Sequence, residues 1–117
     1  MKKLLFSVLM CLGVYYAQAQ VATAVAIGKA VTWAVGAGAT VYRTMPDAEY
    51  TVEYKGGDGA VLYIKASSAD EAILAAAVAL ENGAEYAHIR STYPTVHPSC
   101  RNKRYTKQDV GYLRSRL

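Results

Sequence analysis

The chain has 117 residues, of which 53% are hydrophobic and 19% are charged. This length allows one small domain, and the apolar content excludes a disordered chain. Three prolines and nine glycines also exclude a collagen-like or linker-like composition.

The first 19 residues have the pattern of a secretory signal peptide. Lys2 and Lys3 give a positive start, an apolar run follows, and Ala17 and Ala19 supply the small side chains that signal peptidase needs. We expect cleavage after Ala19 and export to the periplasm or the extracellular space. An uncleaved membrane anchor is the alternative. The leader resembles those of exported proteins of Gram-negative gut bacteria.

Residues 20–43 form an apolar segment rich in alanine and glycine. Within residues 21–42 there are seven alanines and three glycines, and Lys29 is the single charged residue. Large side chains at odd positions are typical of a strand, whereas alanines at positions 22, 26, 30 and 34 are typical of a closely packed helix. The alanine content favours a helix that frays at residues 36–38. Membrane insertion is the alternative, although the charge of Lys29 opposes it.

A β-hairpin is predicted over residues 50–65. Apolar and polar side chains alternate over residues 50–55, which indicates a strand with one buried face. The Gly-Gly-Asp-Gly loop at residues 56–59 can supply positive φ values, and residues 60–65 form the return strand.

A helix and a third strand are predicted to follow. The Ser68 hydroxyl and the Glu71 carboxylate can form a capping box, in which each accepts the other residue's amide, and Gly83 ends the helix. The interior of the helix is apolar on more than the sheet-facing side. We therefore expect residues 21–42 to cover Leu74 and Val78 and to pack against the alanines at positions 75 and 79.

Residues 85–92 give the third strand, so the order is strand, strand, helix, strand. This order predicts an α+β fold with a small ββαβ core over residues 44–99. An apolar Ala/Gly-rich helix precedes the core, and a short basic C-terminal helix follows it.

The C-terminal tail, residues 100–117, is basic. It holds six basic residues and one acidic residue, whereas residues 20–99 hold five basic and eight acidic residues. The apolar side chains of a helix over residues 106–117 would fall on one side, namely Val110, Leu113 and Leu117. Such a tail either docks on the acidic body or meets an anionic membrane surface. The second interpretation predicts salt-sensitive binding to anionic vesicles that is lost on truncation after Cys100.

Candidate catalytic and metal-binding residues are few. Cys100 is the single cysteine after cleavage, so no intramolecular disulfide is expected. His97 and Cys100 make half of a metal site, and no glycine-rich turn exposes the sulfur. We therefore expect no enzymatic activity, no metal and no cofactor. A hydrolase or metal protein that uses His88, His97 and Cys100 is the alternative.

The residues that begin the predicted helix after Ser68 argue against a nucleic-acid partner. The strand–strand–helix order, with Ala-Ala-Ala-Val-Ala-Leu in the helix, resembles double-stranded RNA-binding domains in outline. Those domains open their helix with lysines that grip phosphate. Here Asp70 and Glu71 open the helix and would repel phosphate.

The sequence thus predicts a small exported, non-enzymatic binding protein whose partner is an unidentified protein or envelope component. The alternative is a membrane-associated protein that uses residues 21–42 and the basic tail, and the oligomeric state stays open. A partner could add a strand at an exposed edge of the hairpin. The candidate contact residues are two hairpin tyrosines and the tail cations: Tyr54, Tyr63, Arg101, Lys103, Arg104, Lys107, Arg114 and Arg116.

Overall fold

A computed structural model describes residues 22–36, 40–92 and 98–117. The predicted cleavage site and His97 lie outside these residues. The described strands are β1 (Thr40–Tyr42), β2 (Tyr50–Lys55), β3 (Val61–Ala66), β4 (Tyr86–Ser91) and β5 (Lys103–Tyr105). The described α-helices are α2 (Ala24–Val35), α3 (Ala69–Glu81) and α4 (Val110–Ser115).

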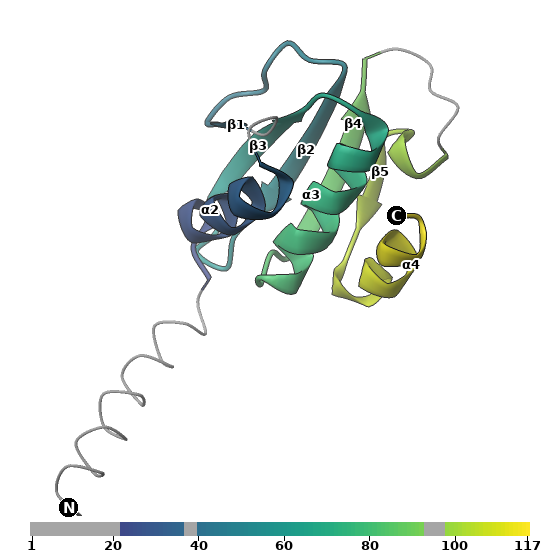
Figure 1. Ribbon diagram of the computed structural model, residues 1–117. Coiled ribbons are helices and arrows are strands. Elements are labelled where there is room, and N and C mark those ends of the chain that lie inside the picture. The colour runs from purple at the N-terminus through teal and green to yellow at the C-terminus, as the bar shows by residue number, and fades with distance from the viewer. Residues whose placement is uncertain (1–21, 37–39, 93–97) are drawn as a thin grey trace, which may run out of the picture.

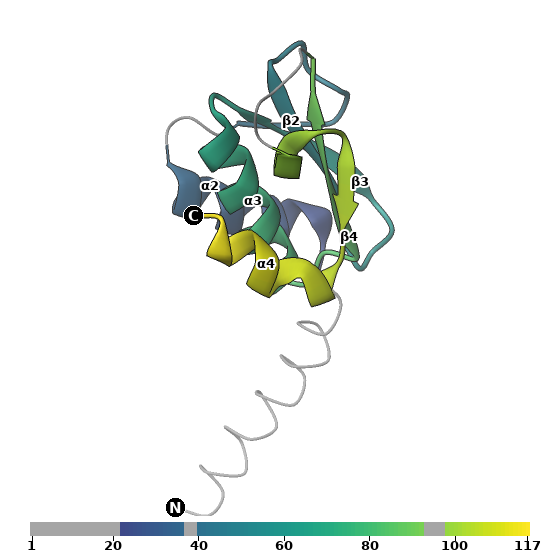
Figure 2. The same cartoon turned by 90° about the vertical axis from the view of Figure 1, so that its right-hand side faces the viewer.

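The strands form one antiparallel sheet with the order β1-β3-β2-β4-β5. All three helices pack on one face of this sheet, with α3 between α2 and α4 (Figure 1). The side view in Figure 2 shows the helices as one layer and the strands as the other. The predicted α+β class is confirmed, as are the apolar helix before the sheet and the short helix after it.

The predicted hairpin is formed by β2 and β3, with Val52 opposite Ile64 and a positive φ of 86° at Gly59. Its first strand is not half-buried as predicted, because β3 and β4 flank β2 on both sides. The polar side chains of Thr51 and Glu53 are therefore also buried. Neither strand of the hairpin ends the strand order, because β1 pairs with residues 63–65 of β3 and β4 pairs with β2, and the edge strands in the described parts of the chain are β1 and β5.

The core lies between the sheet and the helices. Small side chains dominate the buried face of α3, which lets this helix approach the strands closely. The fully buried large side chains come from every layer of the fold and include Tyr54, Ile64, Ile89, Tyr105 and Leu113.

Helix α2 buries a stripe of side chains that differs from the predicted alanine ridge. The stripe consists of Ala24, Ile27, Gly28 and Val31, whereas Ala26 and Ala34 of the ridge are exposed. Burying Ile27 and Val31 removes more apolar surface from water than burying alanines would. The helix ends at Val35, so residues 40–42 are free to form β1, a strand that the sequence pattern did not predict.

The predicted contact of α2 with two alanines of α3 agrees with helical geometry. Glu81 of α3 binds Arg114 of α4, which marks the α4 side of this helix. Ala75 and Ala79 project from the opposite side and are fully buried, so they face α2. Leu74 projects on the Glu81 side and stays partly exposed, so the prediction that α2 covers Leu74 is wrong.

The ends of α3 are capped nearly as predicted. The Ser68 hydroxyl accepts the Glu71 amide at 3.2 Å, and Gly83 has a φ of 103°. The Glu71 carboxylate does not return to Ser68 but accepts the amide and hydroxyl of Ser67, at 3.1 and 2.6 Å. These hydrogen bonds lower the pKa of Glu71.

The basic tail is an integral part of the fold. It adds β5 to the sheet, an unpredicted strand, and then forms α4. The predicted cap at the start of its helical region is present, since Asp109 accepts the Thr106 amide at 2.8 Å. Leu113 is fully buried, whereas Leu117 is 54% exposed. Of the predicted apolar stripe, Leu113 therefore packs into the core and Val110 packs partly buried against it, whereas Leu117 stays exposed.

Candidate functional site

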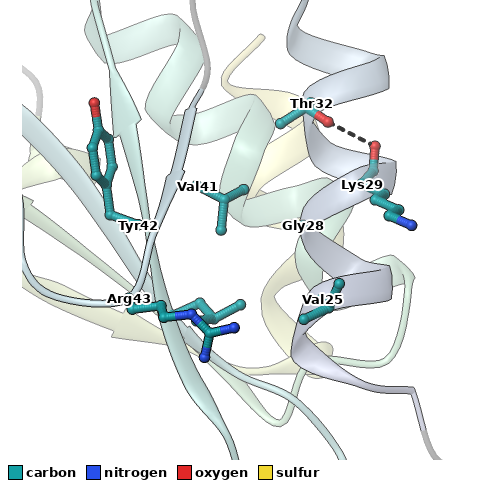
Figure 3. A pocket seen from close by; sticks show the side chains of 8 residues that line it. Val25, Gly28, Lys29, Thr32, Val41, Tyr42 and Arg43 are labelled. Atoms are coloured by element: carbon teal, nitrogen blue, oxygen red, sulfur yellow. Dashed lines mark hydrogen bonds between the residues drawn. The ribbon is translucent and has the colours of Figure 1, made fainter.

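A cleft of about 230 Å³ lies between α2 and β1 (Figure 3). Residues from α2, from β1 and the residue after it, and from β3 line it, namely Val25, Gly28, Lys29, Thr32, Val41, Tyr42, Arg43 and Leu62. The liquid volume of one water is about 30 Å³, so the cleft could hold one large apolar side chain or a short acyl chain.

Gly28 sets the width of this cleft by letting α2 approach the sheet. A Cβ at this position would lie 2.6 Å from the Tyr54 hydroxyl and 3.0 Å from Cγ2 of Val41. The Tyr54 hydroxyl donates to the carbonyl of Ala24 at 2.6 Å, and Asp58 accepts the Ala24 amide at 3.2 Å. These two bonds tie the first residue of α2 to β2 and to the hairpin loop, and so hold one wall of the cleft in place.

The sheet register decides which side chains of the β1 segment enter the cleft. Val41 is opposite the buried Ile64, so its side chain lies on the helix face of the sheet. Arg43 follows two residues later and shares that face, whereas Tyr42 lies on the other face. Figure 3 shows the Arg43 side chain extending toward α2 and the Tyr42 ring pointing away.

Among the described residues that line the cleft, the charged ones are Lys29 and Arg43. No carboxylate is among the lining residues, and within the described parts of the chain neither cation forms an ion pair. An apolar floor bordered by two exposed cations attracts a ligand that is both apolar and anionic.

Exposed apolar side chains occur on both elements that form the cleft, and Val25 and Tyr42 among them line it. Val25 is 54% exposed and Trp33 is 88% exposed, both on α2, and Tyr42 and Met45 on the β1 side are also exposed. Exposed apolar groups that adjoin a cleft are typical of a binding surface.

The predicted contact residue Tyr54 is not on the surface. Its side chain is fully buried beneath α2, and burial followed by the charge of Asp58 raises the pKa of its hydroxyl. Because β2 is central, the face of the hairpin that holds Tyr54 is the core face. Tyr63 lies on the opposite face, across from Glu53, and is partly exposed.

The predicted tail cations do not form one basic patch. Arg104 lies over the Tyr86 ring on the open face of the sheet, at 4.0 Å from its centroid. Lys103 and Arg116 instead approach the Tyr112 ring, at 5.9 and 5.3 Å. Arg114 donates two hydrogen bonds to Glu81, and Arg101 and Lys107 are exposed elsewhere on the tail.

Of the three residues in the alternative thiol or metal site, Cys100 and His88 are described, whereas His97 lies outside the described residues. Cys100 is buried, with its sulfur 3.7 Å from the carbonyl oxygen of Ala69. Burial, and then the charge of Asp70, raises the pKa of this thiol to about 11, so it is protonated at neutral pH. Within residues 22–36, 40–92 and 98–117, no group of three histidine, cysteine or acidic side chains could hold a metal ion.

In the part of the chain that the structure describes, no helix is both long enough and apolar enough to span a bilayer. Comparisons of the chain with protein-family models, with curated proteins and with solved structures gave no match. The cleft is therefore the observation on which a function can be argued.

Sequence reasoning did not select Lys29 and Arg43 as site residues. Lys29 stood out as the single charge in an apolar segment, which is the signal that could have found it. Arg43 carries no such signal, because its role depends on β1 pairing with β3.

Proposed function

We propose that this is a small exported, non-enzymatic binding protein and that the α2–β1 cleft is its ligand site. The observation that carries the proposal is the pairing of an apolar floor with Lys29 and Arg43, which have no carboxylate near them in the cleft. Both cations are exposed, so an anionic ligand can form charge-assisted hydrogen bonds with them while its apolar part is buried against the floor of the cleft.

An NMR titration with hexanoate, a small apolar anion, tests the cleft. We expect amide shifts confined to residues 25–32 and 41–43, with hexylammonium producing none because it repels the two cations. Arg43→Glu should abolish the hexanoate shifts, whereas Lys107→Glu, an exposed tail position, should not. Shifts that map elsewhere, or that are equal for both probes, would show that the cleft is not the site.

Export is supported by the pattern of residues 1–19. Expression of the full chain in a Gram-negative host, followed by mass spectrometry of the periplasm and the medium, tests it. We expect a chain that begins at Gln20. A chain found only inside the cell, or with its leader intact, contradicts export by cleavage.

A membrane-associated role is the second candidate, and the exposed side of α2 favours it. This helix has no acidic residue, and it presents Trp33 and Val25 to solvent beside Lys29. Trp is the side chain that prefers a membrane interface, and a cation attracts anionic lipid.

Vesicle flotation with anionic and zwitterionic lipids separates this role from cleft binding. Trp33→Ser should remove vesicle binding and leave the hexanoate titration unchanged if α2 meets the membrane. Truncation after Cys100 is a poor test, because it also removes β5 and the buried Leu113. Vesicle binding that Trp33→Ser does not weaken rules out α2 as the contact.

A further inference from the structure

The cleft lies beside an edge strand. β1 ends the strand order and pairs with β3 alone among the described strands. The backbone groups on its outer side are therefore without a strand partner in the described parts of the chain. Such an edge is a template on which another extended chain can add.

The helix α2 runs along the same end of the sheet and makes a groove with this edge (Figure 3). A strand added to β1 would lie about 4.8 Å from it, and its side chains would alternate between the two faces of the sheet. Every second side chain would thus fall on the helix face, where Val41 and Arg43 border the cleft.

We propose that the natural ligand of the cleft is an extended acidic peptide segment of a partner protein, added to β1 as a further strand. The segment places one apolar side chain in the cleft and its carboxylates against Lys29 and Arg43. This inference rests on the proposed function, since it requires the cleft to be the ligand site. Main-chain hydrogen bonds to β1 provide affinity, and the cleft and the two cations provide specificity.

The charges favour an acidic segment over a neutral or basic one. Both charged side chains that line the cleft are cations, so a basic segment would meet like charges only. The opposite edge differs, because Lys103 of β5 lies over aromatic rings and Arg114 of the adjacent α4 is bound to Glu81. The β1 edge thus combines cations with an adjoining apolar cleft, whereas Lys103 and Arg114 at the other edge already contact other side chains.

Blocked synthetic peptides test the pairing and the charge separately. One peptide carries glutamate, valine and glutamate at every second position with threonine between them, so that these three side chains share one face of the strand, and its matched control replaces each glutamate with lysine. By NMR titration, we expect the glutamate peptide to bind the cleaved chain at least about tenfold more tightly, with shifts at residues 25–32 and 40–43. Arg43→Glu should reverse this preference, and Arg104→Glu, on the open face of the sheet, should leave it unchanged. Thermal midpoints of both variants show whether each is folded.

N-methylation tests the strand pairing itself. Methyl groups on the amides that face β1 remove donors and block the edge, whereas methyl groups on the alternate amides point away. Of the two methylated peptides, we expect one to lose affinity by at least about tenfold and the other to keep it.

Equal binding of both methylated peptides, or no preference for glutamate over lysine, overturns the peptide inference. If hexanoate still binds the cleft in that case, the proposed function stands. If neither hexanoate nor any peptide shifts the cleft residues, both proposals fail.

Discussion

At the β5 edge of the sheet, a strongly basic tail folds back, and several of its exposed cations contact side chains of the same chain. At the β1 edge, a segment with almost no charge leaves a cleft that holds two unpaired cations. Of the tail, Arg114 is bound to Glu81, while Lys103 and Arg116 lie over aromatic rings. Lys29 and Arg43 have no such partners among the described residues. The number of charges in a segment is therefore a poor guide to a binding surface, and what each charge already contacts is a better one.

The largest change in stability that tests this comparison is expected on substitution of Leu113. If the tail is a structural element, Leu113→Ala should lower the free energy of unfolding by about 2–5 kcal/mol, because it empties a fully buried site. The matched control, Leu117→Ala, removes a half-exposed side chain and should change it by less than about 0.5 kcal/mol. Urea denaturation measures both. Similar small effects for the two variants would mean that the tail is not docked.

Two glycines on opposite helices provide the next test. Gly28→Ala brings a methyl group against Tyr54 and Val41 and should lower the free energy of unfolding by about 1–3 kcal/mol. Gly111→Ala in α4 meets nothing within 4 Å, so it should raise stability by about 0.5–1 kcal/mol. Thermal and urea unfolding of the two variants give the comparison. A neutral Gly28→Ala would show that α2 does not need this close approach.

The pH dependence of stability is expected to report on His88 of β4, a histidine whose pKa is shifted by its surroundings in the fold. Burial, and then the charges of Arg90 and Arg104, lower the pKa of His88, although Glu53 opposes them. The unfolded chain therefore binds a proton at His88 more readily than the folded chain does. This contribution to stability is complete above the unfolded pKa of about 6.5 and is lost as the pH falls below it.

We expect unfolding midpoints measured between pH 7.5 and pH 5, chosen to span about one unit on either side of that pKa, to fall with decreasing pH. His88→Gln should flatten this part of the profile, since glutamine does not titrate. An unchanged slope in the variant would assign the pH dependence to other groups.

The smallest expected changes in the free energy of unfolding come from replacing single cations, and they should differ between Arg114, which has an ion-pair partner, and Lys29 and Arg43. Arg114→Gln should lower the free energy of unfolding by about 0.2–1 kcal/mol at neutral pH and low salt, because the pair with Glu81 is exposed and screened. Lys29→Gln and Arg43→Gln should leave stability within about 0.5 kcal/mol of the parent chain, since neither cation has a carboxylate partner within residues 22–36, 40–92 and 98–117.

Hydrogen bonding to Arg114 lowers the pKa of Glu81, so the stabilisation by this pair is complete above the ordinary glutamate pKa. It is lost as the pH falls through the lowered pKa, and the difference between Arg114→Gln and the parent chain should then disappear. Paired urea titrations at neutral and acidic pH measure this. A difference that persists in acid would show that Arg114 acts through packing instead.

Local signals in the sequence were sufficient to predict β2, β3 and α3. Alternation over residues 50–55, the glycine loop before β3, and the Ser68 and Gly83 caps of α3 each depend on neighbours within a few residues. These signals determine the hairpin, the helix and the next strand, and hence the α+β class.

Tertiary structure alone decided the rest, because those features depend on contacts between distant segments. β1 and β5 have three residues each and are strands only because β3 and β4 offer them an edge. The sequence pattern gave no sign that Tyr54 is buried, because its burial depends on α2, a distant segment that covers it. The cleft needs α2 to pack against the β1–β3 part of the sheet, where Gly28 lets the helix approach Tyr54 and Val41. A binding site built from two distant segments and a close helix–strand contact produces no local periodicity. The sequence therefore could not predict that these residues lie together.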